Sequence, residues 1–202
     1  MMTMISRTTS KFRLTKTTAT TTKVVRALSF AAVLSGCAGP GDALSPDGAA
    51  VRALKDRLER HPSATAVLQE HCSVLIRVVR LPVGEQPSQE TLRLLEVSDP
   101  QQVRTRHVQL LCGDVPLSDA WNWYVPERLT DDMNHLLETT DTPFGKAVSK
   151  TNFYRQRLET RFPDNATGIV LENRAVLRRA SDNAPISLVV EDYLPGALKP
   201  QP

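Results

Sequence analysis

The 202-residue sequence has no apolar run long enough to cross a membrane. Its most apolar stretch, residues 27–34, is less than half of the about 20 residues that a membrane-spanning helix requires. A transmembrane helix is therefore excluded on length. The sequence also lacks internal repeats, and it has no low-complexity tract beyond residues 1–36. Neither a repeat architecture nor a fibrous one is predicted.

The motifs of several large enzyme classes are missing as well. There is no G-x-S-x-G nucleophile turn, no glycine-rich phosphate loop and no H-E-x-x-H helix. Serine-hydrolase, nucleotide-enzyme and zinc-protease mechanisms therefore lack their essential parts. The four histidines are scattered, and His71 beside Cys72 has no second pair at metal-ligand spacing. The sequence predicts neither a metal site nor a cofactor.

Cysteine is scarce, and one of the three cysteines ends a signal-like segment. Six basic residues and no acidic one precede or flank the short apolar run, as in a secretory signal. The run ends in Leu34-Ser35-Gly36-Cys37, which resembles the lipobox of bacterial lipoproteins. This resemblance implies a signal peptide over residues 1–36 and a lipid on Cys37, which would anchor the protein to a membrane. An ordinary secretory signal, or a chance match, is the alternative.

The charge balance changes once residues 1–36 are set aside. The whole chain has 25 Lys+Arg and 22 Asp+Glu, but residues 1–36 hold six of the basic residues and none of the acidic ones, which leaves 19 against 22. The remaining chain is mildly acidic with mixed charges, so nucleic-acid binding is rejected. Residues 37–202 number 166, a usual size for a single domain.

The residues after Cys37 predict a tether and a compartment. Residues 38–48 are rich in Gly, Pro, Asp and Ser, so we expect a flexible tether over 37–48 and a folded domain over 49–202. The anchored domain would face the periplasm, and Ala38, where an aspartate is associated with inner-membrane retention, favours the outer membrane. An oxidising periplasm would permit a disulfide between Cys72 and Cys112. Two buried free thiols are the alternative.

Alternation of apolar and polar residues predicts six or seven strands. The first covers residues 74–81, and the others cover 91–97, 103–112, 117–125, 153–162, 169–179 and 186–194. Helical spacing predicts one broken or two short helices within residues 51–72 and a longer helix over 126–139. Because short links join consecutive strands, antiparallel pairing is favoured. We predict an α+β fold with an antiparallel sheet of about six strands.

Three segments combine a polar function with apolar surroundings. In the first, a period of two puts Arg106 on the face of Val108 and Leu110, where a guanidinium needs a partner such as a carboxylate. An edge-strand arginine that reaches water is the alternative. In the second, Thr142 and Pro143 suit the cap and first position of a short helix, whose free N–H groups attract anions. A plain capped turn is the alternative there.

The third segment, residues 185–195, is an apolar strand with two acids near its end. Alternation sets Glu191 with Val189 and Tyr193. A carboxylate on a half-buried strand usually has a partner or a raised pKa, and either suits ligand binding or proton transfer. Exposure at a frayed strand end is the alternative.

Taken in order, these segments resemble the chorismate pyruvate-lyase family and the related effector-binding domains of some bacterial transcription regulators. The resemblance covers roughly residues 103–198 and depends on the order and spacing of its markers. They are the strand of Arg106, Val108 and Leu110; Gly113-Asp114 followed by Trp123-Tyr124-Val125-Pro126; Thr142-Pro143-Phe144-Gly145; and Glu191-x-x-Leu194-Pro195. The implied fold is an antiparallel sheet whose flanking helices enclose a small cavity.

The resemblance also implies a reaction and a set of site residues. In that family the enzyme removes pyruvate from chorismate and leaves 4-hydroxybenzoate, without metal or cofactor. Arg106 would hold the ring carboxylate, and the backbone at Phe144 and Gly145 would assist it. Glu191 would be the catalytic acid or base at the oxygen on the far end of the ring. Asn122 departs from the pattern, because the lyases carry a second arginine at that place. The lost charge would cost about 2–3 kcal/mol, enough to change the ligand or abolish turnover.

Two principal hypotheses on function follow. The retained Arg106 and Glu191 favour a lyase that acts on chorismate or a similar carboxylated ring. The export signal favours a non-catalytic envelope lipoprotein that binds a small aromatic acid such as 4-hydroxybenzoate, because chorismate is made in the cytoplasm. A third hypothesis is an envelope protein whose cavity is a relic and whose surface serves partner contacts.

Overall fold

A computed structural model of the chain describes residues 46–84, 86–163 and 165–201. The predicted signal peptide, Cys37 and most of the predicted tether lie outside these residues. The described strands are β1 (Arg77–Leu81), β2 (Arg104–Cys112), β3 (Val115–Tyr124), β4 (Phe153–Arg161), β5 (Leu171–Arg179) and β6 (Pro185–Tyr193). The described helices are α1 (Pro46–Arg60), α2 (Ala64–Gln69), α3 (Gln89–Leu94), α4 (Asp131–Thr139) and α5 (Phe144–Ala147).

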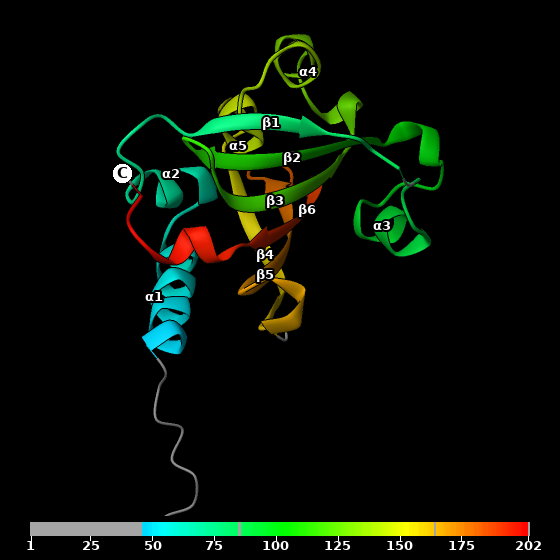
Figure 1. The fold of residues 1–202 in the computed structure, drawn as a ribbon. Helices are drawn as coiled ribbons and strands as arrows, with labels where there is room; N and C mark the ends of the chain where they lie inside the picture. Colours follow the sequence, from blue (N-terminus) through cyan, green and yellow to red (C-terminus); the bar gives the residue numbers. More distant parts are fainter. Residues whose placement is uncertain (1–45, 85, 164, 202) are drawn as a thin grey trace, which may run out of the picture. The chain divides into compact units, whose positions relative to one another are not determined.

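The six strands form one antiparallel sheet in the order β1-β2-β3-β6-β5-β4 (Figure 1). The predicted α+β fold is thereby confirmed. Tight turns join β2 to β3 and β5 to β6, where Gly113 and Asn183 adopt positive φ angles of 58° and 61°. The central pairing of β3 with β6 sets Asn122 opposite Val189 and Ala120 opposite Glu191. This pairing brings Asn122 of β3 close to Glu191 of β6.

Strand alternation gives the sheet two apolar faces, and helices cover each of them. On one face, α1 and α2 pack against Val108 and Leu110 of β2, while α4 and α5 pack farther along against Tyr124 and Val189. On the opposite face, α3 packs against Val125, Val176 and Leu188. Figure 1 shows α1 and α2 at one end of the sheet and α3 at the other. The cavities described below belong to the first face.

The prediction of a strand at residues 91–97 is wrong, because this segment contains most of α3. The Ser88 hydroxyl accepts a hydrogen bond from the backbone N–H of Thr91 and so caps the helix. Leu92 and Leu95 are buried at a spacing of three, which a helix can satisfy on one face. A short run of apolar residues fits both a strand and a helix, and here the cap decides between them.

Three other predicted boundaries shift. β1 begins at Arg77 rather than at Val74, because the side chain of Gln69 binds the carbonyl of Val74 and the N–H of Ile76. The predicted helix over 126–139 divides into a single 3₁₀ turn and α4, which starts after Thr130 caps its first turn. α1 begins at Pro46, inside the range predicted as tether.

A disulfide joins Cys72, just after α2, to Cys112 at the end of β2, with the two Cα atoms 5.7 Å apart. Of the two alternatives for this cysteine pair, the structure has the bonded one. The backbone N–H of Gln201 donates to the carbonyl of His71 beside this disulfide (2.7 Å).

None of the helices in the described part of the chain has the length and apolarity that crossing a membrane demands.

Candidate functional site

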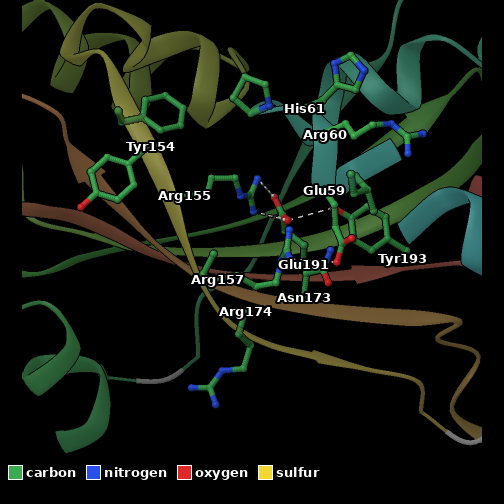
Figure 2. A pocket seen from close by; sticks show the side chains of 14 residues that line it. Glu59, Arg60, His61, Tyr154, Arg155, Arg157, Asn173, Arg174, Glu191 and Tyr193 are labelled. Atoms are coloured by element: carbon green, nitrogen blue, oxygen red, sulfur yellow. Dashed lines mark hydrogen bonds and ion pairs between the residues drawn. The ribbon is translucent and has the colours of Figure 1, made fainter. Parts of the chain in front are cut away.

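Two adjacent cavities lie on the face covered by α1, α2 and α5. The inner cavity measures about 50 Å³ and reaches from Asn122 and Gly145 to Glu191. The outer cavity measures about 260 Å³ and lies between the end of α1 and strands β4 to β6 (Figure 2). Both cavities are lined by Pro62, Phe153, Arg155, Glu191 and Tyr193. These shared residues make the two cavities neighbouring parts of one site.

Glu191 is held from two sides in the wall between the cavities. The Arg155 guanidinium pairs with both carboxylate oxygens, at 2.6 Å from Nη2 to Oε2 and 3.3 Å from Nη1 to Oε1. The Tyr193 hydroxyl donates to Oε2 at 3.0 Å. Figure 2 shows Arg155 and Tyr193 pointing toward Glu191 from opposite sides. Glu191 is therefore an acceptor within a bidentate ion pair, rather than an isolated acid.

The surroundings of Arg155 and Tyr193 determine the charge states of these two side chains. Burial opposes the charge on Arg155, but Glu191 and Tyr193 outweigh burial and raise the pKa of the guanidinium. Burial and the negative charge of Glu191 raise the pKa of Tyr193 well above its ordinary value. Arg155 thus stays charged, and Tyr193 stays a neutral donor.

Arg106 lies on the same face of the sheet but in a different electrostatic situation. Its side chain is only 4% exposed. Nη2 donates to the carbonyl oxygens of Thr142 (3.0 Å) and Thr140 (3.4 Å). Nε and Nη1 are buried without an acceptor, and no described carboxylate forms an ion pair with this guanidinium. Burial, and then the positive charge of Arg80, lower the pKa of Arg106.

The turn between α4 and α5 is fastened to the sheet by two arginines. Arg80 of β1 donates to the carbonyl of Leu137 at 2.7 Å, and Arg106 holds Thr142 from the neighbouring strand. Both cations face the carboxyl end of α4, where positive charge is favourable. The prediction that Thr142 caps a helix here is wrong: Pro143 is the N-cap of α5 and makes no side-chain capping bond.

The structure places the predicted residues along one diagonal of the sheet. Arg106 is the cross-strand neighbour of Asn122, and Glu191 lies on the next strand, one row farther along. Asn122 is buried and lines the inner cavity together with Phe144 and Gly145. Arg106 itself is outside the described lining of both cavities. From strand spacing and rise, the Cα atoms of Arg106 and Glu191 are about 12 Å apart.

Sequence analysis missed Arg155 as a member of the site. Alternation puts Arg155 on the same face as Phe153, which is the signal that drew attention to Arg106. Arg157 has the same spacing and is half exposed, so alternation alone does not distinguish the two arginines. No described group of three or more His, Cys, Asp or Glu side chains is suited to a metal ion.

Several solved structures have a similar fold. PhnF from Mycobacterium smegmatis matches with a TM-score of 0.50 and 12% identity, over 67% of this chain and 64% of that chain. The effector domain of the same protein matches with a TM-score of 0.46 over 59% of this chain and 81% of that chain, at 12% identity. A GntR-family regulator from Bacillus cereus matches with a TM-score of 0.43 and 11% identity, over 59% of this chain and 92% of that chain. At these identities the likeness concerns the fold alone, and the fold part of the predicted resemblance is supported.

A relative in sequence is the uncharacterized protein y4mC of Sinorhizobium fredii. It is 41% identical, and the match covers 50% of this chain and 51% of the relative. The chain thus spans about half the length of this curated relative. No family model matches the sequence.

Proposed function

We propose that this domain binds a small cyclic or aromatic acid and that Arg106 holds its carboxylate. The unpaired guanidinium of Arg106 carries this proposal. A buried charge without a counter-charge is costly, and two of its three nitrogen atoms lack an acceptor. A carboxylate fits the planar guanidinium in a bidentate arrangement and would supply both the missing charge and the missing acceptors.

The other end of the ligand would meet Glu191. The span of about 12 Å between the two Cα atoms matches the length at which one substituted ring could contact both side chains. A ligand hydroxyl would donate to the Glu191 carboxylate, which Arg155 and Tyr193 keep in place. Asn122, between these ends, would add hydrogen bonds without charge. The polar groups thus suit a hydroxylated ring acid such as 4-hydroxybenzoate.

The size of the cavities bears on how such a ligand would enter. The inner cavity of about 50 Å³ is smaller than the roughly 150 Å³ that accommodates benzene. Because Arg106 lies outside the lining of both cavities, a ring held by this arginine must displace the Pro143–Gly145 segment, which lines the inner cavity next to Thr142. Taken together, the two cavities are close to the roughly 300 Å³ at which ligand pockets begin.

Binding without turnover is the function that this geometry favours. Glu191 is engaged by a cation and a hydroxyl, which occupy the carboxylate oxygens that a proton-transfer step would use. Asn122 supplies no charge for a second carboxylate of chorismate. The geometry therefore supports ligand binding better than it supports pyruvate elimination.

Calorimetric titration of the purified protein with 4-hydroxybenzoate tests this proposal. We expect Arg106→Met to weaken binding at least tenfold, because the charged contact to the carboxylate is lost. Arg80→Met is the matched control, since Arg80 holds the same turn but has a more exposed side chain that pairs with Asp141. Equal loss in both variants, or no binding of any ring acid, would contradict the proposal. Release of 4-hydroxybenzoate from chorismate that disappears in Glu191→Gln would instead establish the lyase.

We further propose that the domain is anchored to a membrane of the cell envelope through a lipid on Cys37 and faces the periplasm. The disulfide between Cys72 and Cys112 supports an oxidising compartment, since cytosolic thiols are kept reduced. Fractionation of cells that express the wild type or Cys37→Ala is the test. The wild type should sediment with membranes and the variant should not, whereas identical distributions would refute the anchor.

A further inference from the structure

The mouth of the outer cavity carries an excess of positive charge around a single carboxylate. Glu59, near the end of α1, accepts a hydrogen bond from Lys55 Nζ at 2.8 Å and pairs with Arg157 Nη1 at 3.0 Å. The hydrogen bond from Lys55 is the largest cause of a lowered pKa for Glu59; burial acts in the opposite direction, and the charges of Arg157, Lys55 and Arg60 lower the pKa further. We call Lys55, Arg60 and Arg157 the basic rim. Lys55 and Arg157 thus contact the same carboxylate, and Arg60 lines the cavity without an ion-pair partner of its own among the described residues.

The other carboxylate of the outer cavity does not offset this excess. Glu191 is the partner of Arg155, so that pair is neutral as a unit. Arg174 also lines the cavity, but its guanidinium pairs with Glu90 and Glu159, and in Figure 2 it points away from Glu191. The uncompensated charge therefore belongs to the basic rim, at the open end of the cavity.

We infer that the basic rim is a second anion-binding subsite and that the ligand carries a second anionic group at its outer end. This inference rests on the proposed function, because it extends the same ligand from Arg106 through the two cavities. Arg60 and Arg157 line the outer cavity from opposite sides, from α1 and β4. An oxyanion between them would compete with Glu59 for Arg157. The charge absent at Asn122 is thus supplied from another part of the fold.

The exposure of the basic rim sets the size of the expected effect. Arg157 is 49% exposed and Lys55 is 28% exposed, so water and salt screen these contacts. A second anionic group should therefore tighten binding about tenfold, and the gain should shrink as ionic strength rises. Contacts of this kind affect selectivity among ring acids more than they affect the ability to bind one.

The test compares 4-hydroxybenzoate with 4-hydroxyisophthalate, which is the same ring with a second carboxylate beside the hydroxyl. Calorimetry of the wild type should show about tenfold tighter binding of the dicarboxylate. Arg157→Gln combined with Arg60→Gln should remove this gain, so that the affinity for the dicarboxylate falls by a larger factor than the affinity for 4-hydroxybenzoate. Glu59→Gln should increase the preference for the dicarboxylate, because the carboxylate that competes for Arg157 is removed. Loss of packing alone would not produce such an increase. Arg52→Gln, at an exposed arginine of α1 outside the cavity lining, is the control.

The outcomes separate this inference from the proposed function. If both ligands bind with equal affinity, the basic rim is not a subsite and the proposed function stands. If neither ring acid binds, but inorganic pyrophosphate binds in a manner that depends on Arg157, the proposed function fails and the anion subsite stands. If the rim variants weaken both ring acids equally, the inference is overturned, because the rim then acts on the fold and not on the second anion.

Discussion

Charged side chains on the two faces of the sheet show how single residues set the properties of this domain. On the cavity face, Glu191 has a bidentate cation whereas Arg106 has only carbonyl oxygens. On the opposite face, Asp192 lies between its cross-strand neighbours Asp119 and Glu172, and its Oδ1 is buried without a hydrogen-bond partner. Burial, and then the charges of Glu172 and Asp119, raise the pKa of Asp192 to about 6.

This raised pKa predicts that Asp192 destabilises the fold at neutral pH. The folded state holds the proton up to about pH 6, whereas the unfolded chain releases it near pH 3.8, so stability falls as pH rises between these values. Asp192→Asn should therefore raise the free energy of unfolding by about 1–2 kcal/mol at pH 8, after allowance for solvent screening. At pH 4 the gain should be near zero.

Urea unfolding of the wild type and Asp192→Asn at pH 4 and pH 8 checks this prediction. Asp114→Asn is a suitable control, since this carboxylate is fully exposed beside the β2–β3 turn. The same difference in unfolding free energy at both pH values would show that Asp192 does not titrate in this range.

At the scale of elements, the disulfide ties the helical cover of the cavity to the sheet. Cys72 and Cys112 are 40 residues apart in sequence, and closing a loop of that size removes about 4 kcal/mol of entropy from the unfolded chain. Cys72→Ala combined with Cys112→Ala should lower the free energy of unfolding by about 2–4 kcal/mol. Neither cysteine is among the described residues that line the cavities, so ligand affinity should change little.

Denaturant unfolding with and without dithiothreitol measures this effect. Reduced wild type should approach the stability of the double variant, and the double variant should not respond to the reductant. A wild type that is insensitive to dithiothreitol while its thiols react with an alkylating agent would contradict the stabilising role.

The elements also show what sequence reasoning captured and what it missed. Long alternating segments such as β2, β3 and β6 were predicted to within a few residues, because burial on one face imposes a period of two. α3 was predicted as a strand, since Leu92, Leu94 and Leu95 fit either period and the Ser88 cap was overlooked. Arg155 was missed because a strand arginine that faces a cavity has the same pattern as one that faces water.

At the scale of the whole molecule, the order of strands creates the site. Arg106 and Glu191 are 85 positions apart in sequence, and they share one face because β3 pairs with both β2 and β6. The closing wall then comes from β4, at the far edge of the sheet, through Arg155. Alternation predicts which face a residue occupies, but not which strands are neighbours. The resemblance to a known family named Arg106, Asn122 and Glu191 as members of one site without giving the order of strands, and the structure added Arg155.

The most direct test of the central claim is a crystal structure of the protein with 4-hydroxybenzoate bound. We predict that the ligand carboxylate lies within hydrogen-bond distance of Nε and Nη1 of Arg106, with the hydroxyl directed to Glu191. A ligand carboxylate that pairs with Arg155 instead, with Nε and Nη1 of Arg106 still unpartnered, would contradict the account.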